Sequence, residues 1–85
     1  MTPAQCRGAR ALLGMTQPQL ALGSGLGLST IVDFERIRRH VSKEAIEAMK
    51  IALTRAGVDF IDENGGGPGV RLRQRSRPSA SNNKL

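Results

Sequence analysis

The sequence lacks the residues that would give so small a protein a covalent or metal-based scaffold. It has one cysteine, Cys6, and one histidine, His40, in 85 residues. A single cysteine excludes a disulfide within the chain, and two candidate ligands are too few for a four-ligand zinc site. Because no spacing typical of a catalytic acid pair or triad occurs either, we expect no cofactor and no enzymatic activity.

Aromatic residues and long apolar runs are also scarce. The chain has two phenylalanines, Phe34 and Phe60, and no tryptophan or tyrosine. Stacking on aromatic side chains is a common way to hold single-stranded nucleic acid, so the composition argues against that class of ligand. No apolar run approaches the ~18 residues that a membrane-spanning helix needs, and the polar N-terminus does not resemble a signal peptide. We therefore expect a cytoplasmic protein with no membrane partner.

Positive charge, by contrast, is abundant. Thirteen lysines and arginines oppose seven acidic residues, which gives a net charge of +6. Residues 36–43 and 70–85 contain several basic residues and no acid. Such blocks attract polyanions, either nucleic acid or an anionic membrane surface, although a simply solvated surface is the alternative. Since the sequence is poorly suited to single strands, duplex DNA is the better candidate.

Helix-capping signals divide the first 57 residues into four predicted helices. Thr2 and Thr16 are each followed three residues later by glutamine, which is a capping box, and Ser42 is a third capping residue. Gly14 and Gly57 are suited to end the first and last helices. The apolar residues that we expect on the buried helix faces are Cys6, Ala9, Leu12, Leu13, Leu20, Ala21, Ile31, Phe34, Ala45, Ile46, Met49, Ala52, Leu53 and Ala56.

After Gly57 the pattern changes from helical to alternating. Residues 58–61 and 70–73 are predicted strands, and the glycine-rich stretch between them predicts a β-hairpin with a long loop. That stretch lacks the strand-to-helix context of a phosphate-binding loop. Residues 74–85 have almost nothing to bury, so we predict a disordered basic tail there. The chain thus divides into a helical domain over 1–57, a hairpin over 58–73 and the tail.

The most informative segment is TQPQLALGSGLGLSTIVDFE, which spans residues 16–35. Two short predicted helices flank a turn at Gly25, and helix pairs of this kind place the second helix in the DNA major groove. The segment resembles the helix-turn-helix of the Cro/C1-type (XRE) family of phage and bacterial regulators. The residues that carry the resemblance are Thr16, Gln17, Leu20, Ala21, Gly25, Ser29, Thr30, Ile31, Phe34 and Glu35.

The resemblance covers about residues 3–57, and the segment GVDFIDENGGGPGVRLR further resembles the ending of small rhizobial-type members. It implies a mainly α fold, a four-helix lambda-repressor-like domain followed by a C-terminal β-hairpin. It also implies sequence-specific binding of double-stranded DNA in the nucleoid, as a homodimeric transcriptional regulator that acts as a repressor or autoregulator.

By the same resemblance, residues of the two helices acquire roles. Gln17 is expected to contact a phosphate, unless it is only a helix-start residue. Ser29 and Thr30 lie in the first turn of the recognition helix, about residues 28–36, where family members contact bases and phosphates. Packing of Thr30 under the turn is the alternative. The other candidate DNA contacts are Gly27, Leu28, Val32, Asp33, Arg36, Arg38, Arg39 and Lys43, of which the arginines position the protein rather than read sequence.

Two further features concern how the recognition helix is held. Arg10 and Glu35 resemble a family pair in which an ion pair ties the first helix to the recognition helix. Ile37 stands where many family members have a glycine after that helix. Because a β-branched residue strongly disfavours positive φ, we expect the helix to end with a different turn here.

Leu28 and Val32 depart from the family, whose members often carry polar or basic residues at these positions. If both point outward, they can contact a thymine methyl group but cannot make bidentate hydrogen bonds to a base. Nearby Asp33 would accept a hydrogen bond from cytosine or repel phosphate. An exposed apolar pair also suits a protein partner, so the second hypothesis is a helix-turn-helix derivative that acts as an antiactivator or adaptor. A positive surface around Leu28 favours DNA, whereas an apolar patch rimmed by acids favours a protein.

The predicted hairpin bears on assembly, because a two-stranded ribbon is marginal unless one face is buried. We expect a homodimer formed through the hairpin and the fourth helix, which would read a pseudo-palindromic site. The alternative is a monomer whose hairpin folds back on the fourth helix. The residues predicted at the dimer interface are Ile51, Val58, Phe60, Val70 and Leu72.

Overall fold

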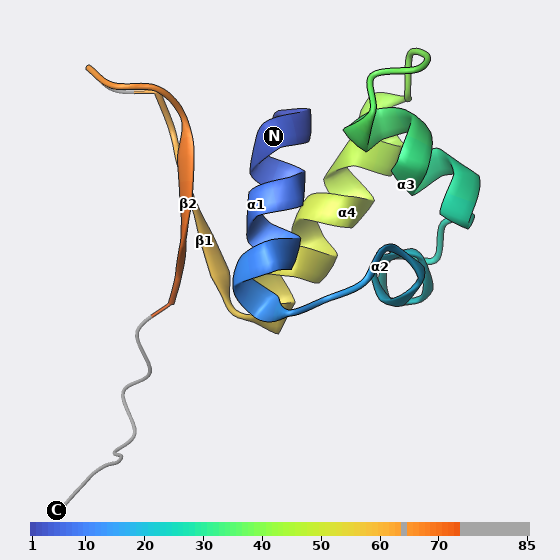
Figure 1. Ribbon diagram of the computed structural model, residues 1–85, viewed down its shortest axis with the longest axis horizontal. Coiled ribbons are helices and arrows are strands. Elements are labelled where there is room, and N and C mark those ends of the chain that lie inside the picture. Colours follow the sequence, from blue (N-terminus) through green and yellow to red (C-terminus); the bar gives the residue numbers. More distant parts are fainter. Residues whose placement is uncertain (64, 74–85) are drawn as a thin grey trace, which may run out of the picture.

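The computed structural model describes residues 1–63 and 65–73. Its fold is mainly α, with four helices followed by a two-stranded antiparallel hairpin, as predicted. The hairpin lies beside α1 at one end of the molecule, and α2 and α3 lie toward the other end (Figure 1). The tail predicted over 74–85 lies outside the described residues. The elements are α1 (Pro3–Leu13), α2 (Gln17–Ser24), α3 (Leu28–Glu35), α4 (Lys43–Ala56), β1 (Val58–Ile61) and β2 (Gly69–Leu72).

The predicted caps set the helix starts. In the first capping box, the Gln5 main-chain N–H donates to Thr2 Oγ1 at 3.0 Å, and the Thr2 N–H donates to Gln5 Oε1 at 2.9 Å. Thr16 and Gln19 form the same pair of bonds at the start of α2. Gly27 precedes α3 without a side-chain bond, which costs only a few tenths of a kcal/mol relative to a capping hydroxyl. In residues 1–63 and 65–73, no helix has the length and apolar character needed to cross a bilayer.

The core forms where all four helices and β1 meet. Two of the predicted buried residues are in fact exposed. Leu12, in the last turn of α1, is 43% exposed. Ala56 is the last residue of α4 and lies past Leu53, the last buried residue of that helix. The buried apolar residues are Cys6, Ala9, Leu20, Ala21, Ile31, Phe34, Val41, Met49, Leu53 and Val58.

The hairpin packs against its own chain, mainly on α1 and partly on α4. Its register pairs Val58 with Leu72 and Phe60 with Val70, so these four side chains share one face. Val70 lies so close to Gly8 of α1 that a Cβ on the glycine would come within 3.3 Å of Val70 Cγ2.

These contacts correct the predicted dimer interface. Val58 is fully buried within its own chain and cannot contribute to a contact surface, and Phe60 and Val70 are half-buried against the core. The ribbon gains its cover from α1, a partner that the sequence analysis did not consider. Only Leu72 on the hairpin and Ile51 on α4 remain well exposed among the predicted interface residues, at 52% and 44%.

Hydrogen bonds fix both ends of the hairpin. Gln5 of α1 donates its side-chain amide to the carbonyl oxygens of Ile61 and Gly69, at 3.3 and 3.0 Å. At the other end, Arg73 donates to the carbonyl oxygen of Thr54 at 2.7 Å and to Asp59 Oδ1 at 3.1 Å. Because Thr54 lies in the last turn of α4, the arginine also meets the negative end of the helix dipole.

The end of α3 contradicts the expectation for Ile37. This residue has a φ of +55°, the left-handed conformation that the sequence analysis excluded for it. Its amide donates to the carbonyl of Phe34 at 3.2 Å, and the Arg38 amide donates to that of Asp33 at 2.9 Å. These are the two bonds of a Schellman motif, which usually has glycine at this position. The two bonds and the surrounding fold therefore hold an isoleucine in a conformation that its side chain disfavours.

Candidate nucleic-acid interface

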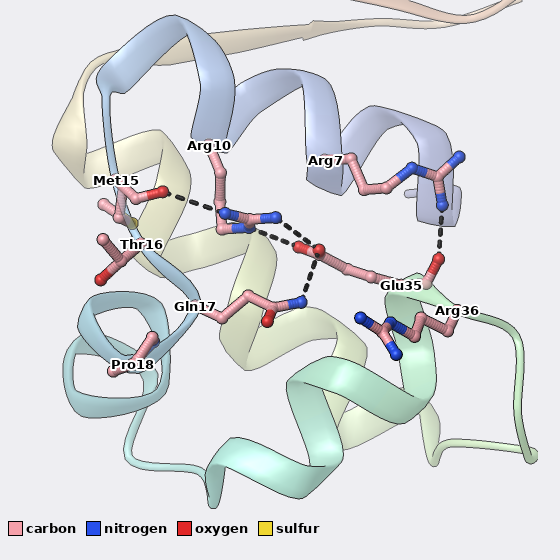
Figure 2. A pocket seen from close by; sticks show the side chains of 8 residues that line it. All are labelled: Arg7, Arg10, Met15, Thr16, Gln17, Pro18, Glu35 and Arg36. Carbon is pink, nitrogen blue, oxygen red and sulfur yellow. Dashed lines mark hydrogen bonds and ion pairs between the residues drawn. The ribbon is translucent and has the colours of Figure 1, made fainter.

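The carboxylate of Glu35, at the end of α3, joins three helices. The residue is 2% exposed. Arg10 of α1 binds it through two hydrogen bonds, Nε to Oε2 and Nη2 to Oε1, both of 2.6 Å. Gln17 of α2 donates to Oε1 at 3.1 Å, and the Cys6 thiol donates to Oε2 at 3.1 Å. The structure thus contains the predicted Arg10–Glu35 ion pair and adds two donors to its carboxylate. Figure 2 shows the bonds from Arg10 and Gln17.

The protonation states of this cluster follow from its geometry. Burial tends to raise the pKa of Glu35, but hydrogen bonds from Arg10, Cys6 and Gln17, together with the charge of Arg10, hold that pKa below its ordinary value. The hydrogen bond with Glu35 raises the pKa of Arg10. Burial, and then the hydrogen bond to Glu35, raise the pKa of the Cys6 thiol. At neutral pH the pair is therefore ionised and the thiol is protonated, so Cys6 is an inert donor in the core.

An open cleft of about 590 Å³ lies beside this cluster, between α1, the start of α2 and the end of α3. Its walls carry three guanidinium groups and one carboxylate, that of Glu35, which is already paired with Arg10. Arg7 donates to the main-chain oxygen of Glu35, and Arg36 points into the cleft from the wall opposite Gln17 (Figure 2). The lining residues are Arg7, Arg10, Met15, Thr16, Gln17, Pro18, Glu35 and Arg36.

The start of α2 adds to the positive character of the cleft. The first amides of a helix have no intrahelical acceptor and lie at the positive end of the helix dipole. Pro18 has no amide hydrogen, and the Gln19 amide already donates to Thr16 Oγ1 at 3.2 Å. The Gln17 main-chain amide is therefore the donor that this helix start can offer to an anion. The Gln17 side chain, for which a phosphate contact was predicted, donates instead to Glu35 in this structure.

Few side chains are accessible at the start of α3, and the largest of them is apolar. Leu28 is 45% exposed and Ser29 is exposed, whereas Thr30 and Val32 are half-buried. Ile31 lies on the opposite, buried face, as predicted. Val32 thus offers less surface than the sequence analysis expected, and Leu28 with Ser29 forms the accessible start of the helix.

Asp33 is paired in a way that the sequence did not indicate. Arg39 Nε lies 2.6 Å from Asp33 Oδ2, and the two side chains are 55% and 18% exposed. A separation of six residues does not bring side chains together on a helix. The pair forms because the turn at Ile37 reverses the chain and returns Arg39 to the end of α3. The negative charge of Asp33 is therefore compensated, and Arg39 is engaged within the free protein.

The structure brings only some of the predicted contact residues together. Gln17 and Arg36 meet at the cleft, whereas Arg38 in the loop after α3 and Lys43 at the start of α4 are exposed and do not line it. Arg7 is a cleft residue that the sequence analysis missed, although its position three residues before Arg10 on the same helix was a usable signal. No known protein family matches this chain, and no curated protein is significantly similar to it.

Proposed function

We propose that this protein binds duplex DNA sequence-specifically through a helix-turn-helix formed by α2 and α3, and that it regulates transcription in the manner of the Cro/C1-type regulators that it resembles. The observation that carries the proposal is the arginine-lined cleft between α1, the start of α2 and the end of α3, a helix whose first turn is exposed. In this arrangement α3 enters the major groove and α2 crosses the sugar-phosphate backbone. The resemblance in residues 16–35 supports the same assignment.

A phosphate group is the ligand that suits the cleft. Arg7 and Arg36 are exposed and supply positive charge, while the Gln17 amide supplies a fixed donor at the positive end of α2. Arg10 stays on Glu35 and holds α1 against α3, so its role is to fix the orientation of the recognition helix. Contacts of this kind set the register of the protein on the duplex without reading bases.

Base recognition falls to the first turn of α3. Leu28 suits contact with a thymine methyl group, and the Ser29 hydroxyl suits a single hydrogen bond to a base edge. This accessible turn carries no arginine, asparagine or glutamine, so it offers no bidentate hydrogen bond to guanine or adenine. We therefore expect a preference for thymine at the position that faces Leu28, with modest discrimination elsewhere.

The charges around Leu28 favour DNA over the alternative of a protein partner. Both acids of α3 are bound by arginine, Asp33 by Arg39 and Glu35 by Arg10. The helix therefore presents no free acid beside Leu28, and the basic residues Arg36 and Arg38 follow its other end. An acidic rim around the apolar residue, which would favour an adaptor role, is not formed by α3.

Affinity for duplex DNA across a salt series tests the proposal. Arg36→Ala should weaken binding to all duplexes alike and reduce the slope of log affinity against log salt by about one unit, because one phosphate contact is lost. Arg71→Ala is the matched control, since it removes the same charge from the hairpin, away from the cleft. Binding without salt dependence, or equal losses in both variants, would refute the assignment of the cleft. Absence of DNA binding together with capture of a protein through Leu28 would establish the adaptor alternative.

A further inference from the structure

The outward face of α4 carries an exposed isoleucine between two opposite charges. Ile51 is 44% exposed, while Met49 and Leu53 on the other side of the helix are fully buried. Glu47 precedes Ile51 by four residues and Arg55 follows it by four, so the three side chains lie in one row along the helix. Among residues 1–63 and 65–73, neither Glu47 nor Arg55 forms an ion pair.

This row borders a shallow groove of about 340 Å³, which is lined by Glu47, Lys50, Ile51, Thr54 and Arg55. Lys50 extends the apolar surface beside the groove, because its ammonium group lies over the ring of Phe60, 5.7 Å from the centroid. The stem of the lysine thus lines the groove beside Ile51. The groove leaves space for a side chain that the protein itself does not supply.

The arrangement is self-complementary. A twofold rotation about an axis through Ile51 brings the position four residues before it opposite the position four residues after it, in antiparallel helices. Glu47 then faces Arg55 of a second copy, and the reverse pair forms by symmetry. Ala48 and Thr54 lie three residues before and after Ile51, so Ala48 of one copy likewise faces Thr54 of the other. Small residues therefore flank the central isoleucine pair. A closed twofold contact requires this kind of surface, in which one patch matches itself.

We propose that the α4 face formed by Glu47, Ala48, Ile51, Thr54 and Arg55 binds the same face of a second copy of the chain. The charge pattern favours a second copy over an unrelated partner, because Glu47 and Arg55 each find their opposite on the same face. The third charge at the groove, the ammonium of Lys50, lies over the Phe60 ring. The contact is small, and exposed ion pairs contribute little, so the dimer is weak in isolation.

This surface is separate from the proposed DNA site. The face lies on α4, which packs on α1, α2 and β1, while the cleft is formed by α1, α2 and α3. Self-association therefore leaves the cleft and the start of α3 open. The proposal goes beyond DNA binding and stands independently of it, since it concerns the protein alone.

Sedimentation equilibrium without DNA tests the proposed pairing through charge reversal. Glu47→Arg and Arg55→Glu should each weaken self-association roughly tenfold or more, because like charges then meet twice across the axis. An equimolar mixture of the two variants should regain association near that of the wild type, since both contacts across the axis then join one acidic and one basic side chain. The double variant Glu47→Arg/Arg55→Glu should regain it as well, for the same reason.

Glu63→Arg is the matched control for Glu47→Arg, because it makes the same change in net charge at an exposed residue after β1 and should leave association unchanged. Circular dichroism establishes that each variant is folded. A wild type that remains monomeric throughout the concentration series, or single variants whose mixture fails to associate, would overturn the proposal. Association that persists in a protein unable to bind DNA would reject the proposed function and leave this interface intact.

Discussion

Two residues at the end of α3 have opposite effects on the stability of the same junction. Glu35 accepts hydrogen bonds from three other side chains and links α1, α2 and α3 through one buried carboxylate. Removal of one partner from such a buried pair leaves an uncompensated charge, which commonly costs about 3–5 kcal/mol. Ile37, two residues later, adopts a left-handed conformation and is 75% exposed, so no burial of its side chain offsets the strain.

Ile37→Gly should therefore stabilise the protein. An L-residue in the left-handed conformation costs about 1–2 kcal/mol, and glycine avoids this cost. Part of the gain is offset because glycine loses more conformational entropy on folding than isoleucine does. We expect a net gain of about 1 kcal/mol, which corresponds to a rise in Tm of about 4–8 °C for a domain of this size. Thermal unfolding followed by circular dichroism measures the change. Ile37→Val keeps the branched side chain and should leave the Tm unaltered, whereas a lower Tm for the glycine variant would contradict the strain.

At the scale of elements, α1 connects the hairpin to the proposed DNA site. One side of the helix bonds and packs against the hairpin through Gln5 and Gly8, and the other side reaches Glu35 through Cys6 and Arg10. Figure 1 shows α1 between the hairpin and the remaining helices. The hairpin therefore stabilises the helix that fixes the end of α3, although the hairpin residues are distant in sequence from those that line the cleft.

A double-mutant cycle at Gly8 and Val70 tests this docking. Glycine inside a helix is about 1 kcal/mol less favourable than alanine, so Gly8→Ala alone would normally stabilise α1. Here the new Cβ would crowd Val70 Cγ2 at 3.3 Å, and we expect the gain to be cancelled. In the Val70→Ala background the gain of about 1 kcal/mol should reappear in urea unfolding.

Gly23→Ala in α2 is the control for that cycle. A Cβ there would lie 4.0 Å from the Ala52 Cβ, an ordinary contact, so the substitution should stabilise by the same amount in both backgrounds. If Gly8→Ala instead stabilises equally with and without Val70, the hairpin does not pack on α1 in solution.

At the scale of the whole molecule, local signals predicted the elements well and long-range contacts poorly. Thr2 and Thr16 marked helix starts because capping joins residues three apart, and Gly57 marked the end of α4 in the same local way. The burial of Val58 and the pairing of Asp33 with Arg39 depend instead on how distant or reversed segments meet. Nothing in the sequence near these residues reports such contacts.

The candidate site also contains features that the sequence predicted and features that it did not. The Arg10–Glu35 pair followed from the family resemblance, because it carries a specific pattern of residues across two helices. The cleft itself and the role of Arg7 required the structure, since they depend on the angle at which α1 meets the start of α2. Positive charge was evident from composition, but composition does not indicate which arginines are free and which are paired.

Selection of bound sites from random duplex DNA tests the central proposal most directly. The protein should enrich a shared motif that contains thymine, because Leu28 is the exposed apolar side chain at the start of α3. If two copies pair through α4, the motif should recur as an inverted repeat with half-sites about 34–36 Å apart, one turn of the duplex. Recovery of unrelated sequences by the folded protein, with no enrichment over the starting library, would contradict sequence-specific DNA binding.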